Sequence, residues 1–302
     1  MAMPLNFQTY LSKSACLAVC ILSTAVGCAH MMTAPSWNAV AHYSPTDGIA
    51  AAWDHAADLP SRTELTAGQL IIHADFPLAG QHRLVRDLEA LRTDVSQELG
   101  LPISDEPVHV YLFEKPDRYQ AFAASHFPAF PARRAFFVES DTKLSVFAHW
   151  QDRVAEDLRH ETTHGYVHAV VPTLPLWLDE GIAEFFELPR VEQGLHREHI
   201  AHLSGRLLEG TWSPNIERLE SLASAAELSQ DHYAEAWCWV HWMLRTSPQH
   251  RSLLQDYLTD LRRNRKTAPL SVRFRQTDES LAESSSAVRV HLEKMASNAD
   301  NR

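Results

Sequence analysis

Cysteine is scarce in this sequence, with four residues in 302, and three of them precede position 29. Beyond that position Cys238 is alone, so an internal disulfide is excluded and stability must come from a hydrophobic core. The tryptophans on both sides of Cys238 predict a buried apolar helix, and burial makes a thiol inert. A nucleophilic role for Cys238 is the less favoured alternative.

Basic side chains are outnumbered by acidic ones. The 27 Lys and Arg residues stand against 38 Asp and Glu residues, which gives a formal net charge of −11. Such a surface does not attract nucleic-acid phosphates, and it would not by itself hold the chain on anionic lipid. The basic run at 262–266 is more typical of a helix C-terminus, where the helix dipole favours cations, than of a binding site.

The N-terminal apolar run is short. Residues 15–22 cannot span a membrane as a mature helix, but they follow Lys13 and suit the core of a signal peptide. We therefore expect a signal peptide over residues 1–27, which takes the protein out of the cytoplasm.

The end of this signal resembles the bacterial lipobox. Residues 24–28 read Thr-Ala-Val-Gly-Cys, and the resemblance implies cleavage before an acylated Cys28. Ala29 is not the aspartate associated with inner-membrane retention. The resemblance therefore implies a location in the bacterial cell envelope, at the outer membrane facing the periplasm. Residues 28–64 are rich in Ala, Pro, Ser and Asp and predict a lipid-anchored tether. A plain secretory signal is the alternative.

Hydrophobic periodicity predicts an α+β fold. A small mixed sheet with helices is expected over residues 65–150, followed by a mainly helical part over residues 151–302. Strands are expected at 69–74, 108–113, 135–138 and 144–148. Helices are expected at 81–99, 115–126, 153–171, 176–188, 196–208, 219–228, 233–245 and 280–295, with a more extended link at 268–277.

The pattern His160-Glu161-Thr162-Thr163-His164 lies on one of these predicted helices. Residues four apart occupy one helix face, so both imidazoles can bind a single metal ion, and zinc favours such ligands. Glu161 lies about 100° around the helix, where it can reach a water on the metal without binding the metal. An exposed charged helix face is the alternative for the pattern alone.

A catalytic zinc needs a third protein ligand, and we expect Glu180 to supply it from the next helix. Glu184 follows one turn later and is placed to accept the second N–H of a ligand histidine. His168 is too far from His160 along the helix to share its ion, so a packing or second-shell role is expected.

The pattern at 160–164, followed by Glu180-Gly181-Ile182-Ala183-Glu184, resembles the gluzincin metallopeptidases, in particular the peptidase MA-like family. The resemblance implies a zincin-like fold, with His160, His164 and Glu180 as ligands of one zinc ion and Glu161 as general base. It also implies that residues 144–148 form the edge strand that pairs with a peptide. The spacer between the two motifs is shorter than in the aminopeptidase branch, so aminopeptidase activity is not assigned.

Tyr233 begins a segment similar to one in gluzincin aminopeptidases. The resemblance implies that its hydroxyl stabilises the oxyanion of the tetrahedral intermediate. The alternative is an ordinary tyrosine at the start of a helix. The resulting hypothesis is a zinc metallopeptidase of the cell envelope that acts on a peptide or protein. Two alternatives stay open, namely a non-catalytic zinc-binding or peptide-binding lipoprotein and hydrolysis of a cell-wall peptide.

Overall fold

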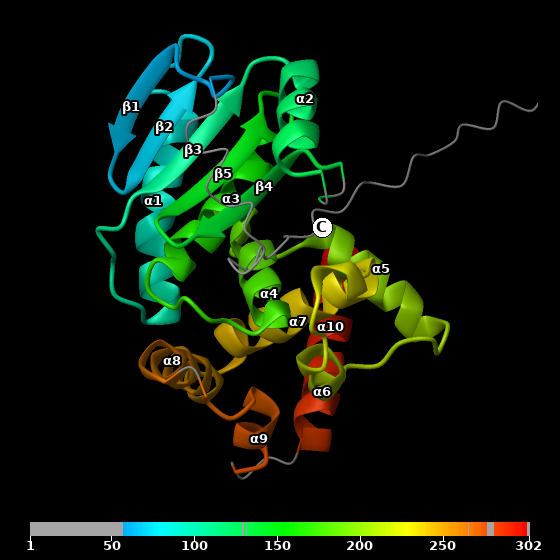
Figure 1. Cartoon of the computed structure of the whole chain (residues 1–302). Coiled ribbons are helices and arrows are strands. Elements are labelled where there is room, and N and C mark those ends of the chain that lie inside the picture. Colours follow the sequence, from blue (N-terminus) through cyan, green and yellow to red (C-terminus); the bar gives the residue numbers. More distant parts are fainter. Residues whose placement is uncertain (1–56, 129, 131, 265, 277–280, 301–302) are drawn as a thin grey trace, which may run out of the picture. The chain divides into compact units, whose positions relative to one another are not determined.

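A computed structural model of the chain describes residues 57–300 apart from 129, 131, 265 and 277–280 (Figure 1). The predicted signal peptide, the Cys28 lipidation site and most of the predicted tether lie outside the described residues. The predicted α+β class is confirmed, because a five-stranded mixed sheet precedes a mostly helical region. The strands are β1 (Thr63–Ala67), β2 (Leu70–Ala74), β3 (Val108–Phe113), β4 (Ala135–Ser140) and β5 (Lys143–His149).

The sheet has the order β1-β2-β3-β5-β4. Strands β2, β3 and β5 are parallel, whereas β1 and β4 pair antiparallel at the two ends. The expectation that residues 144–148 form an edge strand is therefore wrong, and β4 is the edge beyond them. The reason is visible in the sequence, since 144–148 is an almost continuous apolar run, typical of a strand buried on both faces.

Helices cover both faces of this sheet. The face that carries Val108 and Val110 packs against α1 (Arg83–Leu99) and α3 (Val154–His168). The opposite face carries an aromatic cluster closed by α2 (Pro116–His126). As expected, α1 ends at Gly100, whose left-handed backbone (φ 66°) suits glycine.

The remaining helices follow in the order shown in Figure 1. Most predicted helices are present, but the helix expected at 219–228 is wrong, because two short pieces, α6 and η3, take its place. The link at 268–277 contains a short helix, α9 (Leu270–Phe274). The start of α8 (Pro248–Arg263) was not predicted, but the helix ends within the basic run at 262–266, as expected for a helix C-terminus. The elements are α4 (Leu176–Phe186), η2 (Arg190–Glu192), α5 (Arg197–Leu208), α6 (Ile216–Glu220), η3 (Ala225–Glu227), α7 (Gln230–Thr246), α8 (Pro248–Arg263), α9 (Leu270–Phe274) and α10 (Leu281–Asp300).

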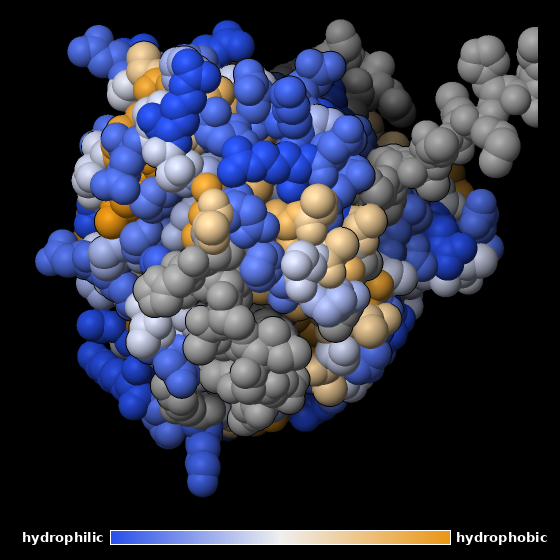
Figure 2. All heavy atoms as spheres, turned by 45° about the horizontal axis from the view of Figure 1, so that its top comes forward, coloured by the Kyte–Doolittle hydropathy of each residue, from blue (hydrophilic) through white to orange (hydrophobic). Residues whose placement is uncertain are grey.

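A continuous hydrophobic cluster joins the sheet to the C-terminal helices. The cluster extends across residue 150, where the sequence predicts the boundary between two subdomains, and β1 begins one residue before the predicted end of the tether at residue 64. Cys238 is buried in this cluster, as expected. The face shown in Figure 2 is predominantly hydrophilic, with a small group of apolar residues near its centre. Within the described residues no helix is long and apolar enough to cross a membrane.

Candidate metal centre

Helix α3 carries the first motif through the middle of the fold. Every residue from Asp157 to His168 is buried, with the sheet on one side and α4 on the other. The two threonines of the motif tolerate this burial because their hydroxyls donate to carbonyls one turn earlier. Gly165 lets the helix approach β3 closely, since an added Cβ would lie 2.7 Å from a methyl group of Val108.

His160, His164 and Glu180 meet between α3 and α4, as the sequence predicts. One ligand atom from each lies within 4.8 Å of the other two, and all three side chains are buried. The His160 Nε2 and Glu180 Oε2 atoms are 3.6 Å apart. Ligands about 2.1 Å from a tetrahedral ion are about 3.4 Å from one another, so this separation fits a metal such as zinc.

The two histidines each direct one ring nitrogen to a carboxylate and leave the other without a hydrogen bond. His160 Nδ1 is 3.0 Å from Glu187 Oε2, and His164 Nδ1 is 2.8 Å from Asp179 Oδ1. Both Nε2 atoms are buried and have no hydrogen-bond partner within the described part of the chain. Buried polar atoms are rarely left unsatisfied, and a carboxylate behind each imidazole is the usual support of a metal ligand.

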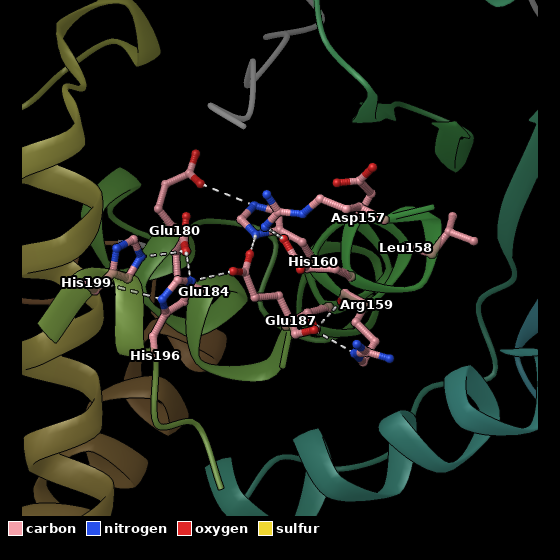
Figure 3. A network of polar contacts seen from close by, with 12 residues as sticks. Asp157, Leu158, Arg159, His160, Glu180, Glu184, Glu187, His196 and His199 are labelled. Atoms are coloured by element: carbon pink, nitrogen blue, oxygen red, sulfur yellow. Dashed lines mark hydrogen bonds and ion pairs between the residues drawn. The ribbon is translucent and has the colours of Figure 1, made fainter. Parts of the chain in front are cut away.

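The expectation that Glu184 supports a ligand histidine is wrong. Glu187 and Asp179 lie behind the two histidines instead, while Glu184 Oε2 lies 2.8 Å from His199 Nε2 (Figure 3). Glu187 also binds His196, whose Nε2 is 2.8 Å from Glu187 Oε1. A buried network of histidines and carboxylates thus continues from the centre into α5. The hydrogen bonds from His160 and His196 outweigh the effect of burial and lower the pKa of Glu187.

His168 is linked to His164 through Asp179, which contacts both imidazoles. Its Nε2 atom is 3.0 Å from Asp179 Oδ2, and its Nδ1 atom is 2.6 Å from Glu139 Oε2. Burial lowers the pKa of His168, but the two carboxylates outweigh this and raise it to about 10. The two carboxylates thus favour the protonated form of His168, which places a positive charge next to Asp179.

Among the described residues three further groups of histidines and carboxylates are close enough to hold an ion, and they involve Asp179, Glu184 and Glu187. In each of these groups a histidine and a carboxylate already share a hydrogen bond of 2.8 to 3.0 Å. A metal would have to replace those bonds. The set formed by His160, His164 and Glu180 is the better candidate, because two of its ligand atoms have no hydrogen bond to lose.

Glu161 lies on α3 beside the ligands and is only 1% exposed. Its Oε2 atom has no hydrogen-bond partner among the described residues. Burial raises the pKa of Glu161 to about 7, although the charges of His160 and Arg133 oppose the rise. A carboxyl group with a pKa near neutrality is suited to exchange protons at physiological pH.

Tyr233 reaches the same region from α7, which packs closely against α4. The close packing depends on Gly181, because an added Cβ there would lie 2.6 Å from the Ala236 carbonyl oxygen. The Tyr233 hydroxyl is buried and has no hydrogen-bond partner in the described part of the structure. Burial and the nearby charge of Glu180 raise the pKa of Tyr233, so its hydroxyl stays a proton donor.

Sequence reasoning missed two more polar side chains near Glu161, namely Tyr119 of α2 and Arg133 in the segment before β4. The Tyr119 hydroxyl and the Arg133 Nη1 atom are buried, and neither has a hydrogen-bond partner within the described residues. The aromatic spacing of α2 indicated only that Tyr119 is apolar core. Nothing in the local sequence distinguishes Arg133 from its neighbour Arg134.

Comparison with known proteins identifies one family. Residues 154–267 match a family described as a protein of unknown function (DUF1570). The match begins at the first residue of α3 and ends beyond α8, so it includes the two helices of the candidate metal centre and Tyr233. It covers less than half of the chain. No curated protein matches the sequence.

Proposed function

We propose that this chain is a zinc-dependent metallopeptidase that hydrolyses peptide bonds. The observation that carries the proposal is the pair of buried, unsatisfied Nε2 atoms of His160 and His164 beside Glu180 and Glu161. A structural zinc site would not require a buried carboxylate next to the three ligands. The motif resemblance to peptidase MA-like gluzincins supports the same reaction.

His160, His164 and Glu180 would hold the zinc ion. When bound, the ion supplies Lewis-acid chemistry, which makes a water acidic near neutral pH and polarises a carbonyl group. Glu161 accepts a proton at Oε2 as water attacks the peptide carbonyl, and it returns that proton to the leaving amine nitrogen. Tyr233 donates a hydrogen bond to the developing oxyanion, which stabilises the transition state more than the ground state.

The carboxylates behind the ligands orient the two imidazoles. Glu187 and Asp179 hold the Nδ1 atoms of His160 and His164, so the two Nε2 atoms face the third ligand. Burial of the whole set lowers the local dielectric and so strengthens each electrostatic interaction in the site. We further propose that the protein acts in the bacterial cell envelope, anchored through a lipid at Cys28, on peptides, proteins or cell-wall peptides.

The test compares the purified chain with Glu161→Gln and with Glu209→Gln, an exposed control. We expect about one zinc per chain in all three by mass spectrometry, and cleavage of a mixed peptide library by the parent and the control alone. Zinc without cleavage in all three would favour the non-catalytic binding protein instead. Absence of zinc from the parent would refute the metal centre itself.

A further inference from the structure

The segment between α2 and β4 places two arginines side by side with different surroundings. Arg134 donates three hydrogen bonds to Asp157, at distances from 2.6 to 3.1 Å. Arg133 makes no hydrogen bond or ion pair within the described residues, although its Nη1 atom is buried. A guanidinium group can donate five hydrogen bonds and cannot lose its charge at physiological pH, so a buried and unpaired nitrogen indicates a missing anionic partner.

Two further unsatisfied polar atoms belong to the same region. Tyr119 is 1% exposed and its hydroxyl has no partner among the described residues; the Nδ1 atom of His149 is likewise buried and unsatisfied. The rings of these two residues are 5.2 Å apart. An apolar ligand would leave this set unsatisfied, whereas an oxygen-rich anion would accept hydrogen bonds from it.

The charge of Arg133 reaches the catalytic side of the metal centre. Burial raises the pKa of Glu161, Tyr119 and Tyr233, and the positive charge of Arg133 opposes the rise in all three. The contacts of the neighbouring residues place Arg133 in this region. Arg134 binds Asp157, which lies one turn before Glu161 on α3. Strand β4 begins at Ala135 opposite Ala148, next to His149, whose ring lies 5.2 Å from that of Tyr119. Because the ion and Tyr233 already serve the oxyanion in the proposed mechanism, Arg133 is available for another group of the substrate.

We propose that Arg133 and Tyr119 form a subsite for the free carboxylate at the carboxyl end of a peptide substrate. The chain would then be an exopeptidase that shortens peptides from their C-terminus. A carboxylate matches the planar fork of arginine with two parallel hydrogen bonds, which a neutral amide cannot reproduce. This inference rests on the proposed peptidase function and specifies its substrate class.

The test uses two libraries of N-acetylated tetrapeptides that differ only in a free acid or an amide at the C-terminus. The full chain is compared with Arg133→Gln, Arg133→Lys and the control Arg262→Gln, whose side chain is exposed on α8. Cleavage products are identified by mass spectrometry. A second readout measures binding without cleavage. The variant Glu161→Gln and the double variant Glu161→Gln/Arg133→Gln are immobilised, and the enrichment of free-acid peptides over amide peptides on each is measured.

We expect the parent and Arg262→Gln to cleave the free acids at least about tenfold faster than the amides, with products shortened at the carboxyl end. Arg133→Gln should lose this preference through a higher KM, and Arg133→Lys should keep part of it. Glu161→Gln should enrich the acids at least about tenfold, and the double variant should not.

The outcomes separate this inference from the proposed function. Equal cleavage of acids and amides, unchanged in Arg133→Gln, would overturn the carboxylate subsite and leave the peptidase intact. Arg133-dependent enrichment of acids without any cleavage would support the subsite and refute the peptidase. Neither cleavage nor enrichment would refute both.

Discussion

The contact between α4 and α7 at Gly181 gives a direct test of how the metal centre is held. In Gly181→Ala the new Cβ would lie 2.6 Å from the Ala236 carbonyl oxygen, where ordinary contact begins at 3.4 Å. The helices would have to separate by about 0.8 Å (3.4 minus 2.6), because the obstructing atom belongs to the backbone. Such overpacking typically costs about 1–3 kcal/mol.

Alanine also favours a helix by about 1 kcal/mol over glycine, so a control is needed. Gly205 on α5 has nothing within 4 Å of an added Cβ, and Gly205→Ala should therefore raise the free energy of unfolding by up to about 1 kcal/mol. The difference between the two variants then isolates the overpacking, about 1–3 kcal/mol in urea unfolding of metal-free protein. Because α4 carries Glu180, Gly181→Ala should also weaken zinc binding in calorimetry, and Gly205→Ala should not. Equal stability of the two variants would refute the close approach of α4 and α7.

Two further predictions concern buried histidines. Asp179→Asn removes the carboxylate behind His164 and should lower zinc affinity about 10- to 100-fold in a competition assay with a chelator. The control Asp231→Asn changes a carboxylate that binds His202 and Arg206 and should leave the zinc affinity unchanged. Equal zinc affinities of the two variants would contradict the proposal that Asp179 supports His164. Burial lowers the pKa of His241 to about 3 and that of His291 to about 4. Both values lie below the pKa of about 6.5 that histidine has in the unfolded chain. The two neutral imidazoles therefore contribute fully to stability above pH 6.5, and this contribution is lost as the pH falls toward 4. Between pH 7 and pH 5 this loss is about 1–2 kcal/mol for each histidine. In urea unfolding, the free energy of unfolding of the double variant His241→Phe/His291→Leu should therefore fall less between these pH values than that of the parent.

The three side chains of the candidate metal centre could be predicted because the relevant geometry is local. Two histidines four residues apart must share a helix face, and the short turn after α3 brings Glu180 opposite them. The partners of the ligands were harder to predict, because they depend on how two helices cross. Glu184 has the spacing of a support residue, yet Glu187, at the C-terminal end of α4, reaches His160 instead.

The sheet shows the same limit. Four of the five described strands followed from their apolar runs, but β1 did not, because its sequence Thr-Glu-Leu-Thr-Ala has a single large apolar residue. The order of the strands did not follow either, because β5 enters between β3 and β4. Arg133 and Tyr119 come from elements outside both motifs, so only the folded chain places them near Glu161. Short helices such as α6 and α9 form through packing, and five residues carry too little periodicity to reveal them.

The position of α3 has a consequence for hydrogen exchange. Its amides are enclosed by the sheet and by α4, so exposing them to deuterium requires the loss of the whole core. The helix that carries His160, Glu161 and His164 should therefore rank among the slowest-exchanging parts of the chain, with protection equal to the global stability. Any motion that would admit a substrate would then have to arise in the elements around α3, while His160, Glu161 and His164 keep their places.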